Sequence, residues 1–247
     1  GINYNINSKS NVFVNAGYID RQPLFDAVFP NFGNDINPDL QNERIESLEI
    51  GYGYVGKRLK FNVNAYNTNW GNRFVSRSLS NQQGVDGFAQ FRNIDVVHKG
   101  IEAEGTYRVG STKIRGMLSI GDWTYTKDFE AELFDENQQS IGTGKLYTKG
   151  AKVGDAAQFV AVIGLDQSLG SNIKFDIDYR FVDGLYADYS ITDSAFTNPD
   201  NPGALQLPSY GLVDLGATFY ASNGWSLRGN VNNLLDTYYI AESNSNI

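Results

Sequence analysis

Apolar residues alternate with polar or small ones between Tyr210 and Ile240, and this period of two constrains the fold more than any other feature. Residues 211–236 read GLVDLGATFY, then ASNG, then WSLRGNVNNLLD. Successive side chains of a β-strand point to opposite faces, so each arm is predicted to be a strand with one apolar and one polar face. The sequence ASNG between them is typical of a tight turn, so the segment predicts a β-hairpin.

The same period recurs back through the chain and predicts about ten strands in all. Besides the two arms of this hairpin, the predicted strands are residues 2–6, 12–19, 45–55, 59–75, 94–109, 113–126, 157–169 and 173–186.

The connections between these strands are short and long in strict alternation. The short ones, rich in Gly, Asn and Ser, are residues 7–11, 56–58, 110–112, 170–172 and 221–224. The long ones are residues 20–44, 77–93, 127–155 and 187–208, and within them 128–155 is expected to be exposed because it carries charges of both signs. Short turns at one rim and long loops at the other predict an all-β fold, a transmembrane antiparallel up-and-down β-barrel.

Charged residues share one face of the predicted strands, and apolar residues share the other. Lipid-facing Lys or Arg at the bilayer centre costs about 2–4 kcal/mol, so the charged face must line a wide, wet lumen. Four aromatic residues lie on the apolar face next to short turns, where a membrane-interface girdle is expected: Tyr54, Tyr107, Phe219 and Trp225.

Composition excludes several classes of protein. The 247 residues include one His and no Cys, which excludes disulfide frameworks, thiolate metal sites and a His-rich metal centre. The net charge of −8 argues against nucleic acid as a partner. The sequence contains no run of 18 apolar residues, so no membrane-spanning helix is predicted. Because no secretory signal precedes Gly1, we expect a processed chain or part of a longer product.

Two stretches carry a resemblance to a known family. Asn37-Pro38-Asp39-Leu40-Gln41-Asn42-Glu43, followed by SLEIGY at residues 47–52, is similar to the opening of a mid-barrel strand in TonB-dependent outer-membrane transporters. NNLLDTYY at residues 232–239 resembles the penultimate strand of the same family. The two occur in order, about 190 residues apart, and the resemblance covers the whole chain.

The resemblance implies a barrel of about 22 strands that an N-terminal plug closes and a TonB box couples to the inner membrane. With no segment like the plug or TonB box, residues 1–247 are expected to be a C-terminal portion of that barrel. The family would add an extracellular loop and a last strand beyond Ile247. Unpaired strand edges are prohibitive in lipid, so the remaining strands are expected from other sequence or other chains.

No catalytic constellation is predicted, so the chain is not expected to be an enzyme or to hold a cofactor or metal. Asp176 with Asp178, and Glu102 with Glu104, recur at alternate positions and are interpreted as a solvated lumen wall. Aromatic rings beside Arg suit an anionic chelate, a planar ligand or a sugar face. The ligand-binding residues predicted at the long-loop end are Trp70, Arg73, Arg92, His98, Trp123, Tyr125 and Arg180, with Phe25, Phe29, Phe32 and Tyr189 in the wider set.

The leading functional hypothesis is active import of a scarce ligand such as a ferric siderophore, cobalamin or glycan. The alternatives are a passive porin and a structural or adhesion barrel that docks a surface partner. The expected partners are outer-membrane lipid and lipopolysaccharide, the TonB complex, a small-molecule or oligosaccharide ligand, and a surface lipoprotein. The predicted location is the bacterial outer membrane, with the long loops outside the cell and the short turns in the periplasm.

Overall fold

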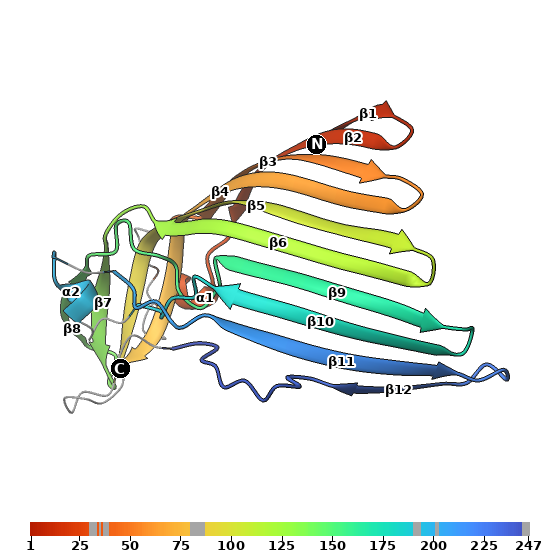
Figure 1. Ribbon diagram of the computed structural model, residues 1–247. Coiled ribbons are helices and arrows are strands. Elements are labelled where there is room, and N and C mark those ends of the chain that lie inside the picture. The colour runs from red at the N-terminus through yellow and green to blue at the C-terminus, as the bar shows by residue number, and fades with distance from the viewer. Residues whose placement is uncertain are drawn as a thin grey trace.

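The computed structural model describes residues 1–29, 34, 36, 40–79, 87–189, 194–200 and 203–243. In this part of the chain, one antiparallel sheet runs in the order β1-β2-β3-β4-β5-β6-β9-β10-β11-β12, and β7 and β8 branch from β5 (Figure 1). The strands are β1 (Ile2–Asn7), β2 (Ser10–Arg21), β3 (Glu43–Val55), β4 (Leu59–Leu79), β5 (Gly87–Val109), β6 (Thr112–Tyr125), β7 (Phe129–Asp135), β8 (Ser140–Leu146), β9 (Phe159–Leu169), β10 (Ile173–Asp183), β11 (Tyr210–Tyr220) and β12 (Ser226–Val231).

Every predicted strand and every predicted tight turn is present. The hairpins join β1 to β2, β3 to β4, β5 to β6, β9 to β10 and β11 to β12, all at one end of the sheet (Figure 1). The prediction for the last arm was too long, because β12 ends at Val231. Asn233 has a φ of 51° and accepts a hydrogen bond from the Thr237 backbone N–H at 2.9 Å, so the chain turns there.

The prediction of a loop over residues 77–93 was wrong at both of its ends, because β4 continues to Leu79 and β5 starts at Gly87. The two strands stay paired through a double irregularity at Asn72 and Asn93, whose φ angles are 57° and 56°. The Asn72 backbone N–H donates to Asp95 Oδ1 at 2.9 Å, which holds the first bulge. Each bulge inserts one extra residue, so the side-chain alternation reverses above it.

The prediction of a loop over residues 127–155, exposed over residues 128–155, was wrong where two strands form and bury one face. This stretch contains β7 and β8, which pair with each other and with the upper part of β5. Phe129, Ala131 and Leu146 are at most 4% exposed. Glu130, Glu132 and Lys145 lie on the other face of the hairpin, and such charges are why composition alone suggested exposure.

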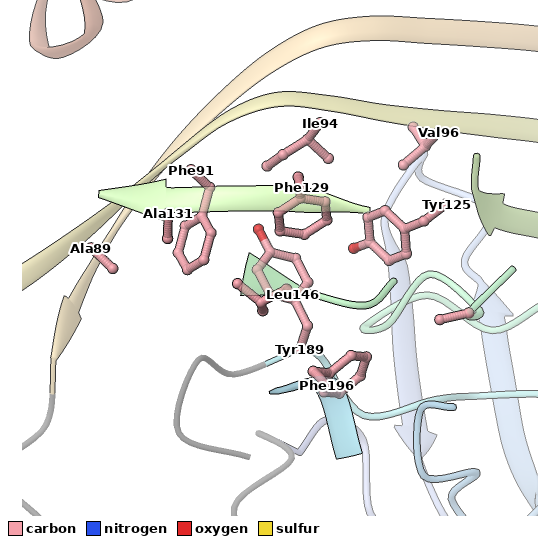
Figure 2. Packing of buried hydrophobic residues seen from close by; sticks show 11 residues of the cluster. Ala89, Phe91, Ile94, Val96, Tyr125, Phe129, Ala131, Leu146, Tyr189 and Phe196 are labelled. Atoms are coloured by element: carbon pink, nitrogen blue, oxygen red, sulfur yellow. The ribbon is translucent and has the colours of Figure 1, made fainter. Parts of the chain in front are cut away.

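We call the extension above the bulges the cap. It comprises β7, β8, the parts of β4 and β5 beyond the bulges, the short helix α2 (Ser194–Thr197) and the residues around Tyr189. Its buried residues surround the Tyr189 ring, which lies 5.3 Å from Phe91 and 5.2 Å from Phe129 between centroids (Figure 2). The cluster contains Ala89, Phe91, Ile94, Val96, Tyr125, Phe129, Ala131, Leu146, Ala151, Tyr189 and Phe196.

The rest of the sheet, which we call the wall, is a single curved layer (Figure 1). Its apolar face is open: Leu48, Ile50 and Ile163 are each more than half exposed. In the described residues β1 and β12 do not pair with each other, so the sheet has two free edges. The described residues contain no helix that is long and apolar enough to cross a bilayer. The other described helix, α1 (Phe25–Val28), is a single turn between β2 and β3.

Candidate ligand-binding wall

The strand register separates the two faces of the wall. Ile50 pairs with Ala65, Ala65 with Ile101, and Ile101 with Ile120, so an apolar row crosses four strands. Ile101 and Ile120 are 54% and 46% exposed, although both are apolar. No second layer of the described protein covers this face, which makes it suited to contact with lipid. The register also places Tyr54, Tyr107 and Phe219 on this face, next to the tight turns, and Trp225 directly precedes β12.

The opposite face of the wall is polar along its height. The Asn64 side-chain amide donates to Glu49 at 3.0 Å and to Glu102 at 3.4 Å, which links three strands. Towards the tight turns, Asp166 is the centre of an ion-pair network. This carboxylate lies 3.7 Å from Lys113, 3.2 Å from Arg115 and 3.2 Å from Lys174.

The carboxylates at positions 176 and 178 belong to the same polar surface. Arg228 binds both oxygens of Asp176, at 2.7 and 2.8 Å, while Arg115 lies 2.9 Å from Asp178. Each acid therefore has its own guanidinium partner. Such pairs hold strands together across a wet surface and leave neither Asp176 nor Asp178 free for acid–base work.

Nearer the cap, the polar face carries aromatic residues. The Trp123 indole N–H donates to the Tyr66 hydroxyl at 2.9 Å. The His98 ring lies 5.4 Å from the Trp123 ring in an edge-to-face arrangement. Strand pairing of β4, β5 and β6 explains the contact, because Thr68, His98 and Trp123 are direct neighbours in the register.

A second aromatic site lies one row closer to the cap. The Arg73 guanidinium stacks on the Trp70 ring at 4.3 Å, which is a cation–π geometry. The Trp70 indole N–H donates to Glu43 at 3.1 Å, and Arg21 lies 3.6 Å from the same carboxylate. Arg73 follows the β4 bulge, so the reversed alternation brings it to the same face as Trp70.

The structure separates the other predicted site residues from these two groups. Tyr125 is 4% exposed and lies in the cap core. Arg92 follows the reversed alternation to the outer face of the cap, where it pairs with Glu132 at 3.0 Å. Arg180 is exposed on the polar face of β10. In the wider set, Tyr189 is in the cap core and Phe32 lies outside the described residues, as do residues 37–39 of the strand-opening motif.

Burial affects the ionisable side chains of the cap. Burial raises the pKa of Tyr189 to about 12. Arg77 approaches the Tyr189 ring at 4.7 Å and forms an ion pair with Asp188, which is 7% exposed. These contacts fasten the segment between β10 and β11 onto β4.

A cavity of about 610 Å³ lies on the outer face of the cap. Its lining includes Arg92, Lys127 and Lys145 together with Glu130 and Glu132, so charges of both signs face it. Within the described residues, no group of three or more His, Asp or Glu side chains is arranged to hold a metal ion.

Sequence reasoning missed Tyr66 and Glu43 as parts of the two aromatic sites. Tyr66 is an aromatic residue on the polar phase of a strand otherwise lined by Asn62 and Asn64, and that mismatch was the available signal. Glu43 gave no such signal, because its partner Trp70 is known only from the pairing of β3 with β4.

A single sheet with one face suited to lipid and one charged face is part of a transmembrane β-barrel. The family described as TonB dependent receptor-like, beta-barrel, matches residues 1–234. The chain therefore belongs to the TonB-dependent receptor β-barrel family, which comprises integral barrels of the bacterial outer membrane that act as transporters rather than enzymes.

Individual relatives agree with this assignment. The vitamin B12 transporter BtuB of Photobacterium profundum is 25% identical, over 99% of this chain and 34% of that protein. The copper transporter OprC has a similar structure, with a TM-score of 0.68 at 15% identity over 98% of this chain and 34% of that one.

The ferric-catecholate import receptor Fiu from K12 E. coli matches with a TM-score of 0.62 at 17% identity, over 98% of this chain and 31% of that one. At these identities the solved structures show the fold alone. The chain spans about a third of the length of the relatives that it matches.

Proposed function

We propose that residues 1–247 are the C-terminal portion of a TonB-dependent importer, with the plug, the TonB box and the remaining strands in other sequence. The ligand binds on the lumen wall beneath the cap, and a TonB-driven movement of the plug admits it to the periplasm. The orientation follows from the hairpins: tight turns lie in the periplasm, and the cap lies outside the cell.

The stacked pair of Arg73 and Trp70 is the observation that carries this proposal. Both residues lie on the polar face where the wall meets the cap, Trp70 before the β4 bulge and Arg73 directly after it, above the ion-pair network of the wall. A guanidinium held over an indole offers charge and a planar surface together. Such a pair suits an anionic chelate or another planar ligand.

The relatives bear on the class of ligand. Their names indicate vitamin B12, copper and ferric catecholates as the cargo of those proteins. Each is a metal or a metal complex that is scarce outside the cell. We therefore propose a scarce ligand of this kind, such as a ferric siderophore or cobalamin, with a glycan as the remaining candidate.

Uptake by the full-length receptor tests the proposal. Cells that carry the wild type or Arg73→Gln are supplied with a ferric catecholate, cyanocobalamin or a labelled oligosaccharide, with and without a protonophore. One ligand is expected to enter only in energised cells, and Arg73→Gln lowers its uptake about tenfold through the loss of roughly 1–2 kcal/mol of charge-assisted and cation–π contact.

Arg108→Gln is the matched control. Arg108 lies on β5, on the same polar face of the sheet as Arg73 but at the tight-turn end. This variant is expected to transport like the wild type. Uptake that persists without the proton gradient would point to a porin instead. A receptor that imports none of the ligands and co-purifies with a surface lipoprotein would favour a docking barrel.

A further inference from the structure

We propose that Gly100 and Gly121 hold Tyr66 and Trp123 flat against the lumen wall, so that the two rings form a stacking platform for a ring of the ligand. The inference deepens the proposed function, on which it rests. It assigns the two glycines as positioning residues and the two rings as the surface that the ligand touches.

The indole ring of Trp123 lies directly over Gly121. A methyl group placed on Gly121 would lie 2.8 Å from Nε1, 3.0 Å from Cε2 and 3.3 Å from Cδ1 of Trp123. Three atoms of the pyrrole ring therefore cover the glycine. Side-chain carbons do not approach ring atoms this closely, so only glycine allows the indole to lie down on the strand.

The same arrangement holds Tyr66 on the neighbouring strand. A methyl group on Gly100 would lie 2.6 Å from the Tyr66 hydroxyl oxygen and 2.8 Å from Cζ. Tyr66 comes from β4 and reaches across β5, where it meets Trp123 of β6 through the 2.9 Å hydrogen bond. The two rings thus lie end to end over three strands.

Burial indicates which side of the platform is available. Tyr66 and Trp123 are both half-buried, and the buried side of each ring faces the glycine beneath it. The other side faces the lumen. His98 contacts Trp123 in an edge-to-face arrangement, with 5.4 Å between the ring centroids.

The chemistry of the pair defines the ligand group. The Tyr66 oxygen accepts the Trp123 N–H, so the Tyr66 O–H proton is left to donate. A flat ring with a hydrogen-bond acceptor at its edge fits this surface, by stacking and by one hydrogen bond. Aryl rings and pyranose rings share these properties.

Two other glycines provide matched controls. Gly17 lies on the lumen face of β2, and a methyl group there meets nothing within 4 Å. Gly211 lies on the lipid face, where a methyl group would meet the Tyr179 ring at 2.6–3.0 Å. Gly17→Ala tests the substitution without a clash, and Gly211→Ala tests the displacement of a ring away from the lumen.

The experiment measures probe binding to the purified full-length receptor. Catechol serves as the aryl probe and methyl β-glucopyranoside as the pyranose probe, and their dissociation constants are obtained by saturation-transfer NMR. Gly121→Ala is expected to weaken the better probe about tenfold, or about 1.4 kcal/mol, while both controls stay within about twofold of wild type. Equal binding by Gly121→Ala and Gly17→Ala would overturn the proposal.

A second pair of variants covers a failure of Gly121→Ala to assemble. Trp123→Leu removes the platform and is expected to abolish probe binding, whereas Tyr66→Phe keeps the ring and weakens binding about threefold. Unchanged binding by Trp123→Leu would equally overturn the proposal. Gly100→Ala is a poorer test, because the added methyl group would also meet the Ile120 carbonyl oxygen at 2.6 Å.

Probe binding and energised uptake separate the two proposals. If Gly121→Ala loses the probe but the receptor imports no ligand, the platform stands and the import proposal fails. If the receptor imports its ligand and Gly121→Ala binds the probe like the controls, import stands and the platform fails.

Discussion

The wall and the cap are built from the same strands, yet they are stabilised in different ways. In the wall, both faces of a single layer meet a solvent, lipid on one side and water on the other, and the backbone ladder supplies the order. In the cap, β7 and β8 extend the sheet beside β5, Tyr189 and α2 pack onto it, and a dry aromatic core forms. Within the described residues, the buried hydrophobic cluster therefore lies at the cap, whereas apolar side chains of the wall are exposed on the face assigned to lipid.

The largest expected effect tests the cap core. Phe91→Ala removes a fully buried ring and is expected to destabilise the cap by about 3–5 kcal/mol. Hydrogen exchange of the β5 and β7 amides measures this loss. Ile163→Ala is the matched change in the wall, where the side chain is 59% exposed, and its cost is expected to be much smaller. Equal costs at the two sites would remove the distinction between cap and wall.

The next effect tests the two faces of the wall. Leu118 and Ser119 are adjacent on β6 and face lipid and lumen respectively. Leu118→Lys is expected to destabilise the barrel by about 2–4 kcal/mol, whereas Ser119→Lys is tolerated because its charge meets water. Denaturant unfolding of the full-length receptor in lipid vesicles measures both. A larger cost for Ser119→Lys would reverse the assignment of the faces.

The smallest expected effect is a loss of stability in the cap at high pH. Burial raises the pKa of Tyr189 from an ordinary value near 10 to about 12, so the folded cap favours the neutral phenol. This contribution is fully present below pH 10 and is lost as the pH rises towards 12, which weakens the cap by at most about 3 kcal/mol.

Near-ultraviolet circular dichroism between pH 9 and 12 follows the loosening of the cap, and Tyr189→Phe should remove the transition assigned to this residue. A transition that persists unchanged in Tyr189→Phe would contradict the prediction.

Sequence reasoning predicted the strands and the two faces of the wall, because a period of two indicates both, although it made the last arm too long. It failed in the cap for a physical reason. Residues 129–133 also alternate, but Glu130 and Glu132 between the apolar positions suggested solvent rather than a strand with one buried face. Arg92 was misplaced because the bulge at Asn93 depends on the pairing partner and leaves no local signal.

The candidate site was predictable only in part. Two pairs of predicted residues are in contact, Trp70 with Arg73 and His98 with Trp123, because each pair lies on neighbouring positions of the sheet. Tyr66 was not identified as a site residue, since its contact with Trp123 requires the register of three strands. Whether any of these residues binds ligand stays a prediction.

The matched bulges at Asn72 and Asn93 have a consequence for how such a receptor diversifies. The two bulges reverse the side-chain alternation of β4 and β5 at the same level of the sheet. The parts of β4 and β5 beyond the bulges and the β7–β8 hairpin therefore form a unit, a cassette, whose alternation is independent of that in the wall. Changes of length or composition inside that cassette leave the spacing of the membrane-embedded repeat untouched. New surfaces at the cap end can therefore be exchanged on an unaltered lipid-facing frame.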